Sequence, residues 1–173
     1  MNGALGHLVI APIVLPLAAA ALVVMIDQRS LRVALSLAAT VALLLISITL
    51  LLSVSAPDAI AARVYRLGDW PAPFGIVLVL DRLSAMMVTL ASLLALAALV
   101  FSLARWDQAG PRFHALFLLL LAGLNGAFLT GDLFNLFVFF EVLLAASYGL
   151  VLHGSGVPRV KAGLHYIAVN LGA

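Results

Sequence analysis

The sequence predicts an all-α polytopic membrane protein with one short β-hairpin outside the bilayer. Hydrophobic residues make up 65% of the 173 residues and charged residues 9%. A soluble domain contains roughly 45–50% apolar and about 25% charged residues. The mean hydropathy of the chain is +1.25. Its apolar residues form long segments, which short polar stretches separate. Integral membrane proteins are the class that combines these features.

We expect five complete spanning helices and an incomplete sixth, because each complete segment approaches the roughly 20 residues that cross a bilayer. All of them form part of one membrane domain. Leu171 to Ala173 fall halfway through the sixth segment without a polar flank, which predicts the N-terminal part of a longer protein. Pro12 and Pro16 predict a kink, not a break, in the first helix. The expected helices cover residues 5–26, 31–54, 83–104, 113–129, 133–152 and, incompletely, 161–173.

The lysines and arginines predict the orientation of the chain. Cytoplasmic loops carry the excess of these residues. Six lie in the first, third and fifth connections, and three lie on the opposite side, so the N-terminus is expected outside. We therefore expect a multi-pass protein of the bacterial inner membrane. The six are Arg29, Arg32, Arg105, Arg112, Arg159 and Lys161, and the three are Arg63, Arg66 and Arg82.

Residues 55–80 form the one sizeable connection between apolar segments. Two β-prone runs, at residues 63–67 and 75–80, flank a stretch rich in glycine and proline. This pattern predicts a short hairpin on the outer face. An interfacial loop without regular structure is the alternative. Trp70 lies in this connection and is expected to anchor it at the outer membrane surface.

Glu141 is the strongest candidate for a functional residue. It is the one ionisable side chain other than tyrosine between Leu133 and Leu152. The nine residues from Asp132 to Glu141 span about 13 Å of helix, close to half of a roughly 30 Å hydrocarbon core. A carboxyl at that depth is costly and typical of proton relays. The structural alternative is a permanently neutral acid that hydrogen-bonds a neighbouring helix.

Two neutral polar side chains are candidates to extend a path from Glu141. Tyr148 lies seven residues further along the same helical face, where it could prolong a hydrogen-bonded path or serve as an interfacial anchor. Asn125 is expected as the polar neighbour of Glu141 on the preceding helix. Gly123 and Gly126 flank it and permit close helix approach. Helix packing alone explains the asparagine and both glycines equally well.

Two further candidates lie near the ends of helices. Asp132 follows Thr130-Gly131 at the expected start of the fifth helix, where an N-cap is the simpler interpretation and the outer mouth of an ion path the other. His165 lies four residues beyond Lys161, and histidine is the residue type that suits proton uptake from the cytoplasm. Lys161 is expected to extend to the membrane surface.

The sequence offers no pattern for covalent catalysis. It contains no cysteine, no glycine loop for phosphates and no nucleophile with a matching base. The histidines are too scattered for a metal site. The net charge of +2 lies in short connections and reports topology, not nucleic-acid binding. We therefore expect a non-enzymatic membrane protein without cofactor, metal or nucleic-acid partner.

Three segments of the chain carry motifs that indicate a protein family. The motif TGDLFNLFVFFEVLLAASYGLVLHG at 130–154 is similar to the fifth helix of the D subunit of the Mrp-type (also Pha or Mnh) multisubunit cation/proton antiporters. WPAPFGIVLVLDRLSAMM at 70–87 resembles its outer hairpin and third helix, and HLVIAPIVLPLAAAALVVM at 7–25 resembles its first helix. Antiporter-like proton-pumping subunits of respiratory complex I and of membrane-bound hydrogenases are related around the Phe-Glu pair.

The resemblance implies a role for Glu141 that composition does not. In the family, the corresponding glutamate pairs with a lysine of the seventh helix, and inverted repeats with broken helices build the path. Those lysine positions lie beyond Ala173. The resemblance therefore implies a subunit of a hetero-oligomeric complex that moves protons in exchange for Na+ or K+. It also implies that this part is inactive alone.

Two other functions compete with the antiporter interpretation. The first is a proton-pumping subunit of complex I or of a hydrogenase, which redox subunits in the same assembly would distinguish. The second is a membrane protein without transport activity, in which Glu141 is structural. Replacement of Glu141 by glutamine would then leave ion movement unchanged.

Overall fold

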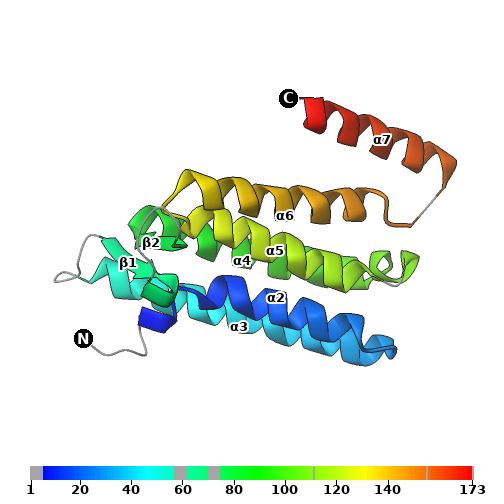
Figure 1. The fold of residues 1–173 in the computed structure, drawn as a ribbon. Helices are drawn as coiled ribbons and strands as arrows, with labels where there is room; N and C mark the ends of the chain where they lie inside the picture. Colours follow the sequence, from blue (N-terminus) through cyan, green and yellow to red (C-terminus); the bar gives the residue numbers. More distant parts are fainter. Residues whose placement is uncertain (1–5, 57–61, 70–74, 111, 155, 173) are drawn as a thin grey trace.

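The protein is a helical bundle with a small two-stranded antiparallel sheet at one end (Figure 1). The computed structural model describes residues 6–56, 62–69, 75–110, 112–154 and 156–172. The expected all-α class with one hairpin is confirmed. The helices are α2 (Ala11–Val24), α3 (Arg29–Ser55), α4 (Arg82–Leu103), α5 (Phe113–Leu129), α6 (Leu133–Val151) and α7 (Val157–Gly172), the strands are β1 (Ala62–Arg66) and β2 (Val77–Asp81), and the short 3-10 helices are η1 (Leu67–Asp69) and η2 (Trp106–Ala109).

The helices α2 to α6 run side by side, with α5 packed against α2 on one side and α6 on another (Figure 1). Helix α7 diverges from the bundle. Among the described residues, α3, α4 and α6 are long and apolar enough to cross a membrane, while α2 and α5 are shorter apolar helices. The helical membrane class is thus supported, and the number of complete spans stays an expectation.

Two helix starts differ by more than two residues from the expected positions, and local backbone chemistry explains both. Helix α7 begins at Val157 instead of Lys161. Gly154 and Gly156 adopt φ of 90° and 108°, a region that favours glycine and ends the preceding turn. Helix α2 begins at Ala11 with a proline in its first turn, where the missing N–H costs nothing. The expected start at residue 5 lies outside the described residues.

The hairpin between α3 and α4 is confirmed, and it is docked on the connection between α5 and α6. Strand β2 pairs with β1 from Ala62 opposite Asp81 to Arg66 opposite Val77. Its side chains Leu78 and Leu80 are buried. The backbone N–H of Gly131 donates to the Val77 carbonyl at 2.8 Å. The hairpin therefore fixes the turn from which α6 starts. The expected membrane anchor Trp70 lies outside the described residues.

Asp81 links this hairpin to the start of α4. Its carboxylate accepts from the Ser84 N–H at 2.7 Å, and the Ser84 hydroxyl accepts from the Asp81 N–H at 2.9 Å. These reciprocal bonds form a capping box. Hydrogen bonds from Ser84 lower the pKa of Asp81 below its ordinary value, because they favour the charged carboxylate. The cap therefore contributes its full stability above about pH 4, the ordinary carboxyl pKa, and loses it as the pH falls further.

Candidate functional site

Glu141 lies in the middle of α6, on the face that turns away from α5. Helix α6 buries only Asn135 and Ala146, and Glu141 is exposed. Phe134 and Phe137, seven and four residues earlier on the same face, are 74% and 63% exposed. The carboxyl therefore belongs to a broad apolar surface of α6 that the described residues leave uncovered.

Within the described part of the chain, Glu141 makes no hydrogen bond and no ion pair. A carboxyl in hydrocarbon without a partner is costly, and intramembrane acids face a protein interior or a water-filled cavity. The position thus requires either further protein or water against this face of α6. The structural alternative, a hydrogen bond to a neighbouring helix, is not made by any described residue.

The position of α6 depends on its close approach to α5. A β-carbon at Gly123 would lie 2.7 Å from the backbone nitrogen of Leu143, and one at Gly126 would overlap the ring of Phe139. At Gly123 the clash is with backbone, so a larger side chain would force the helices apart, whereas at Gly126 the ring of Phe139 would have to move. The two glycines therefore set the distance between α5 and α6, as small residues do in membrane helices.

Asn125 forms a hydrogen bond with α2 and not with Glu141, its expected neighbour. Its side chain is fully buried, and its Nδ2 donates to the backbone carbonyl of Pro12 in α2 at 2.9 Å. Pro16 follows four residues later in α2 and has no N–H, so it leaves this carbonyl without its intrahelical donor. Asn125 thus compensates for the proline and joins α5 to α2. The structure does not bring its amide to Glu141.

Tyr148 lies at the end of α6 where α7 approaches. Its ring meets that of Tyr166 edge-on, with 5.7 Å between the ring centroids. Its hydroxyl is buried and has no hydrogen-bond partner among the described residues. Seven helical residues separate it from Glu141 by about 10 Å, too far for a direct hydrogen bond. A path between the two groups stays a prediction that needs water or another side chain.

Asp132 is the N-cap of α6, which confirms the simpler of its two interpretations. Its Oδ1 accepts from the Asn135 N–H at 2.7 Å, and its Oδ2 accepts from the Asn135 side chain. Burial acts to raise the pKa of Asp132, but the hydrogen bonds from Asn135 and the backbone outweigh it and hold the pKa below its ordinary value. The cap defines where α6 begins, and the expected depth of Glu141 is counted from that start. A role at the mouth of an ion path stays a prediction.

His165 and Lys161 both lie exposed on α7. Helix α7 contacts α6 only weakly and points away from the bundle (Figure 1). The described residues give His165 no hydrogen-bond partner, and the structure does not bring its ring to Glu141. The uptake of protons through His165 therefore stays a prediction.

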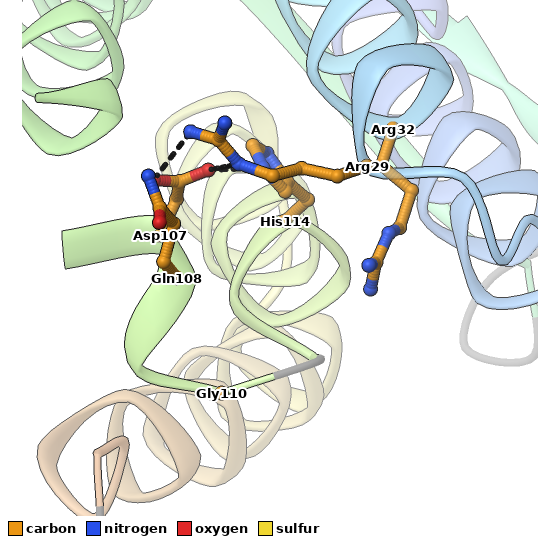
Figure 2. Close-up of a pocket in the computed structure, with 6 residues that line it drawn as sticks. All are labelled: Arg29, Arg32, Asp107, Gln108, Gly110 and His114. Carbon is orange, nitrogen blue, oxygen red and sulfur yellow. Dashed lines mark hydrogen bonds and ion pairs between the residues drawn. The ribbon is translucent and has the colours of Figure 1, made fainter. Parts of the chain in front are cut away.

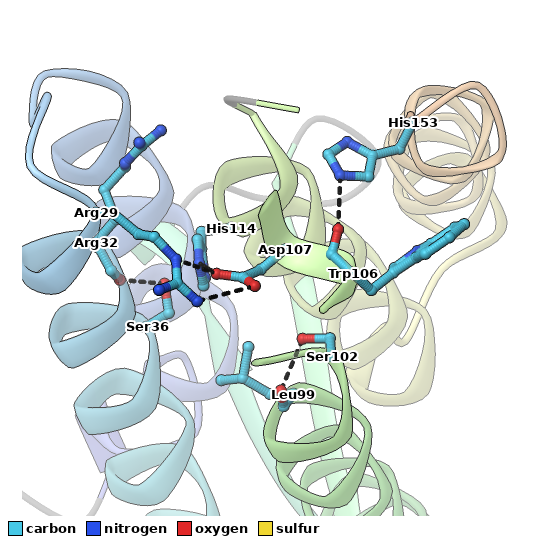
Figure 3. A network of polar contacts seen from close by, with 9 residues as sticks. All are labelled: Arg29, Arg32, Ser36, Leu99, Ser102, Trp106, Asp107, His114 and His153. Carbon is cyan, nitrogen blue, oxygen red and sulfur yellow. Dashed lines mark hydrogen bonds and ion pairs between the residues drawn. The ribbon is translucent and has the colours of Figure 1, made fainter. Parts of the chain in front are cut away.

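A polar cluster lies at the opposite end of the bundle from the hairpin, and the sequence did not predict it. Arg29 donates through Nε and Nη2 to the two carboxylate oxygens of Asp107, at 2.9 and 3.2 Å. The ring of His114 lies behind this pair, with Nε2 3.7 Å from Asp107 Oδ2 (Figure 3). In the sequence, Arg29 served only to predict the orientation of the chain. The presence of Asp107 in the third connection was the one sequence feature that could have indicated this ion pair.

A second set of contacts at this end joins the third and fifth connections. His153 Nε2 lies 3.2 Å from the Trp106 carbonyl (Figure 3). The guanidinium of Arg159 lies 4.6 Å from the Trp106 ring centroid and donates to the His153 carbonyl at 2.6 Å. Aromatic and basic side chains of this kind gather at membrane surfaces. These contacts support a membrane boundary at this end.

The fold and Glu141 together define a class of protein: a polytopic helical membrane protein with one carboxyl midway along an apolar helix. No protein-family model matches the chain. Curated relatives do. The chain is 61% identical over its whole length to the probable K+/H+ antiporter D subunit of Rhizobium meliloti, of which it covers 33%. It is 42% identical over 96% of its length to the Na+/H+ antiporter D subunit of Alkalihalophilus pseudofirmus, of which it covers 34%.

Solved structures agree with these relatives. A chain of the Mrp complex from a Dietzia species matches 99% of this chain with a TM-score of 0.84 and 36% identity, over 32% of its own length. A chain of the membrane-bound sulfane sulfur reductase, an archaeal respiratory membrane complex, matches 94% with a TM-score of 0.82 and 28% identity, over 33% of its own length. The resemblance of this chain to the D subunit of the Mrp-type antiporters is confirmed. The chain spans about a third of the length of the relatives it matches.

Proposed function

We propose that this chain is part of a proton-translocating membrane subunit of a multisubunit Na+/H+ or K+/H+ antiporter, with Glu141 as its protonatable group. The single observation that carries the proposal is the combination of antiporter relatives with an ionisable residue midway along α6. A carboxyl takes up and releases a proton as its surroundings shift its pKa. Exchange then requires that the carboxyl face each side of the membrane in turn.

The uncovered face of α6 supports a site that is completed by other protein. Glu141 lies on it without a partner among the described residues, and exposed apolar side chains surround it. Further helices of the same subunit are the proposed cover, and a cationic side chain on one of them would favour the charged form of the carboxyl. The proposed partners are the other subunits of the complex, the lipid bilayer, protons and Na+ or K+. On this proposal, residues 1–173 alone transport nothing.

The redox-driven proton pump is the second candidate function, and one observation favours it. The likeness to a chain of an archaeal respiratory membrane complex is nearly as good in fold as the likeness to the Mrp complex. The higher identity of the antiporter relatives supports the first candidate. The proposed orientation places the protein in a bacterial inner membrane, with the N-terminus outside and the Arg29 end of the bundle facing the cytoplasm. This orientation suits both candidate functions.

Exchange in membrane vesicles that contain the complete complex tests the proposed function. The vesicle interior is first acidified, and Na+ or K+ is then added outside. The added cation is expected to release protons from the vesicles, which a pH-sensitive dye inside them reports. Choline chloride of the same osmolarity is the control and is expected to release none. Proton movement that requires an electron donor and does not depend on Na+ or K+ would contradict the antiporter and identify the redox-driven pump. No proton movement under either condition would contradict both.

A further inference from the structure

Helix α3 begins with an unfavourable arrangement of charges. Arg29 and Arg32 both lie in its first turn, with no acidic residue there, and the N-cap Gln28 makes no side-chain capping bond. The N-terminus of a helix carries the positive end of the macrodipole and unpaired N–H groups. Two cations at this position are repelled by that end of the helix. Negative charge from outside α3 would stabilise it.

Asp107 of η2 supplies one such negative charge, which forms an ion pair with Arg29. Both carboxylate oxygens accept from Arg29, and the Asp107 side chain is 1% exposed. The Arg29 side chain remains 50% exposed, so its guanidinium still presents donors beyond the ion pair. These donors are available to a second anion that approaches from outside the bundle.

A cavity of about 370 Å³ opens beside this cluster. Its lining comes from α3, η2, α5 and the connection before α5 (Figure 2). His114 lines it while only 3% exposed, and neither of its ring nitrogens has a hydrogen-bond partner among the described residues. The nearest carboxylate oxygen, Asp107 Oδ2, lies 3.7 Å from Nε2, beyond hydrogen-bond distance. A buried ring whose nitrogens make no hydrogen bond is costly unless another group donates to it or accepts from it. The lining residues are Arg29, Arg32, Asp107, Gln108, Gly110 and His114.

We propose that this cavity binds a phosphate-type anion through Arg29, Arg32 and His114. Guanidinium groups match phosphate oxygens in charge and geometry, and an N–H of His114 can donate to the same group. The volume lies at the lower end of the roughly 300–1,000 Å³ of ligand pockets, which suits a single headgroup. The cluster lies at the membrane boundary that Trp106 and Arg159 mark, so the phosphate comes either from a phospholipid or from solution. Such binding would occur whether or not the protein transports ions.

Binding to the delipidated complete complex tests this site. The probes are radiolabelled inorganic phosphate in equilibrium dialysis and phosphatidylglycerol scored by native mass spectrometry. Arg32→Gln removes one donor without unpairing Asp107 from Arg29, and we expect binding to weaken roughly tenfold. Arg105→Gln is the matched control, because Arg105 is an exposed arginine at the same end of the bundle that does not line the cavity. It should change binding by less than about twofold.

The two probes distinguish the two sources of phosphate. Weakened binding of phosphatidylglycerol alone assigns the site to a lipid headgroup, and weakened binding of inorganic phosphate assigns it to a free anion. Equal weakening by Arg32→Gln and Arg105→Gln, or no binding of either probe, would overturn the proposal. If Arg32→Gln does not assemble, His114→Gln takes its place with the same expected loss, since it removes the imidazole but keeps a polar side chain.

Discussion

Replacement of Glu141 by glutamine is expected to reduce cation/proton exchange by the complete complex to the background of empty vesicles. The amide has nearly the same shape and keeps hydrogen-bonding capacity, but it neither takes up nor releases a proton. Assembly is expected to continue, because no described residue depends on Glu141 for a hydrogen bond or ion pair. The loss would therefore be specific to transport.

The measurement is dye-reported exchange at matched expression, and Asp132→Asn is its control. Asp132 is the other acid of the motif, and asparagine caps helices about as well as aspartate. The cap interpretation predicts that Asp132→Asn keeps exchange close to the wild-type rate. Normal exchange in Glu141→Gln would remove Glu141 from the mechanism. Equal loss in both variants would indicate that any charge change at this helix disrupts the protein.

Replacement of Gly123 by alanine is expected to be among the most destabilising single-methyl changes in the bundle. Alanine by itself favours a helix by about 1 kcal/mol over glycine. At this position, however, the new β-carbon would lie 2.7 Å from the backbone nitrogen and 3.0 Å from the Cα of Leu143. Backbone atoms do not move aside as a side chain does, so α5 and α6 must separate. Overpacking of this kind costs roughly 1–3 kcal/mol or more.

Gly149→Ala is the matched control for this change. Gly149 is also helical, but its new β-carbon would meet the terminal methyl groups of Leu116 at 2.8 and 2.9 Å, which can rotate away. Thermal unfolding of the purified complex is expected to show a lower transition temperature for Gly123→Ala than for Gly149→Ala. Equal transition temperatures would show that the α5–α6 contact is looser than the structure has it.

Local patterns in the sequence were sufficient for most of the architecture. Apolar length and polar separators predicted the helices, and β-prone runs around a glycine- and proline-rich turn predicted the hairpin. The Thr-Gly-Asp sequence predicted the cap at Asp132, because capping depends on residues within one turn. The helix starts at Val157 and Ala11 were missed, since the positive φ of Gly156 and the proline in the first turn of α2 outweighed the extent of the apolar segments.

The candidate site was harder to predict, because tertiary contacts decide it. Asn125 was expected beside Glu141, but the carbonyl that Pro16 leaves unpaired lies on α2, 113 positions away from Asn125 in sequence. The pairing of Arg29 with Asp107 spans 78 positions. Neither distance leaves a periodic signal. The expected depth of Glu141 in the membrane came from counting residues along one helix, whereas the direction that Glu141 faces required the packing of α6 on α5.

The most direct test of the central claim measures the protonation of Glu141 itself. A hydrophobic carbodiimide modifies protonated carboxyls within the membrane, and mass spectrometry of the treated complete complex locates the adduct. We expect modification at Glu141 that falls as the pH rises and that Na+ or K+ suppresses, with Glu141→Gln as the unlabelled control. A Glu141 that stays unmodified at every pH, or modification that neither pH nor cations change, would contradict a carboxyl that exchanges its proton during transport.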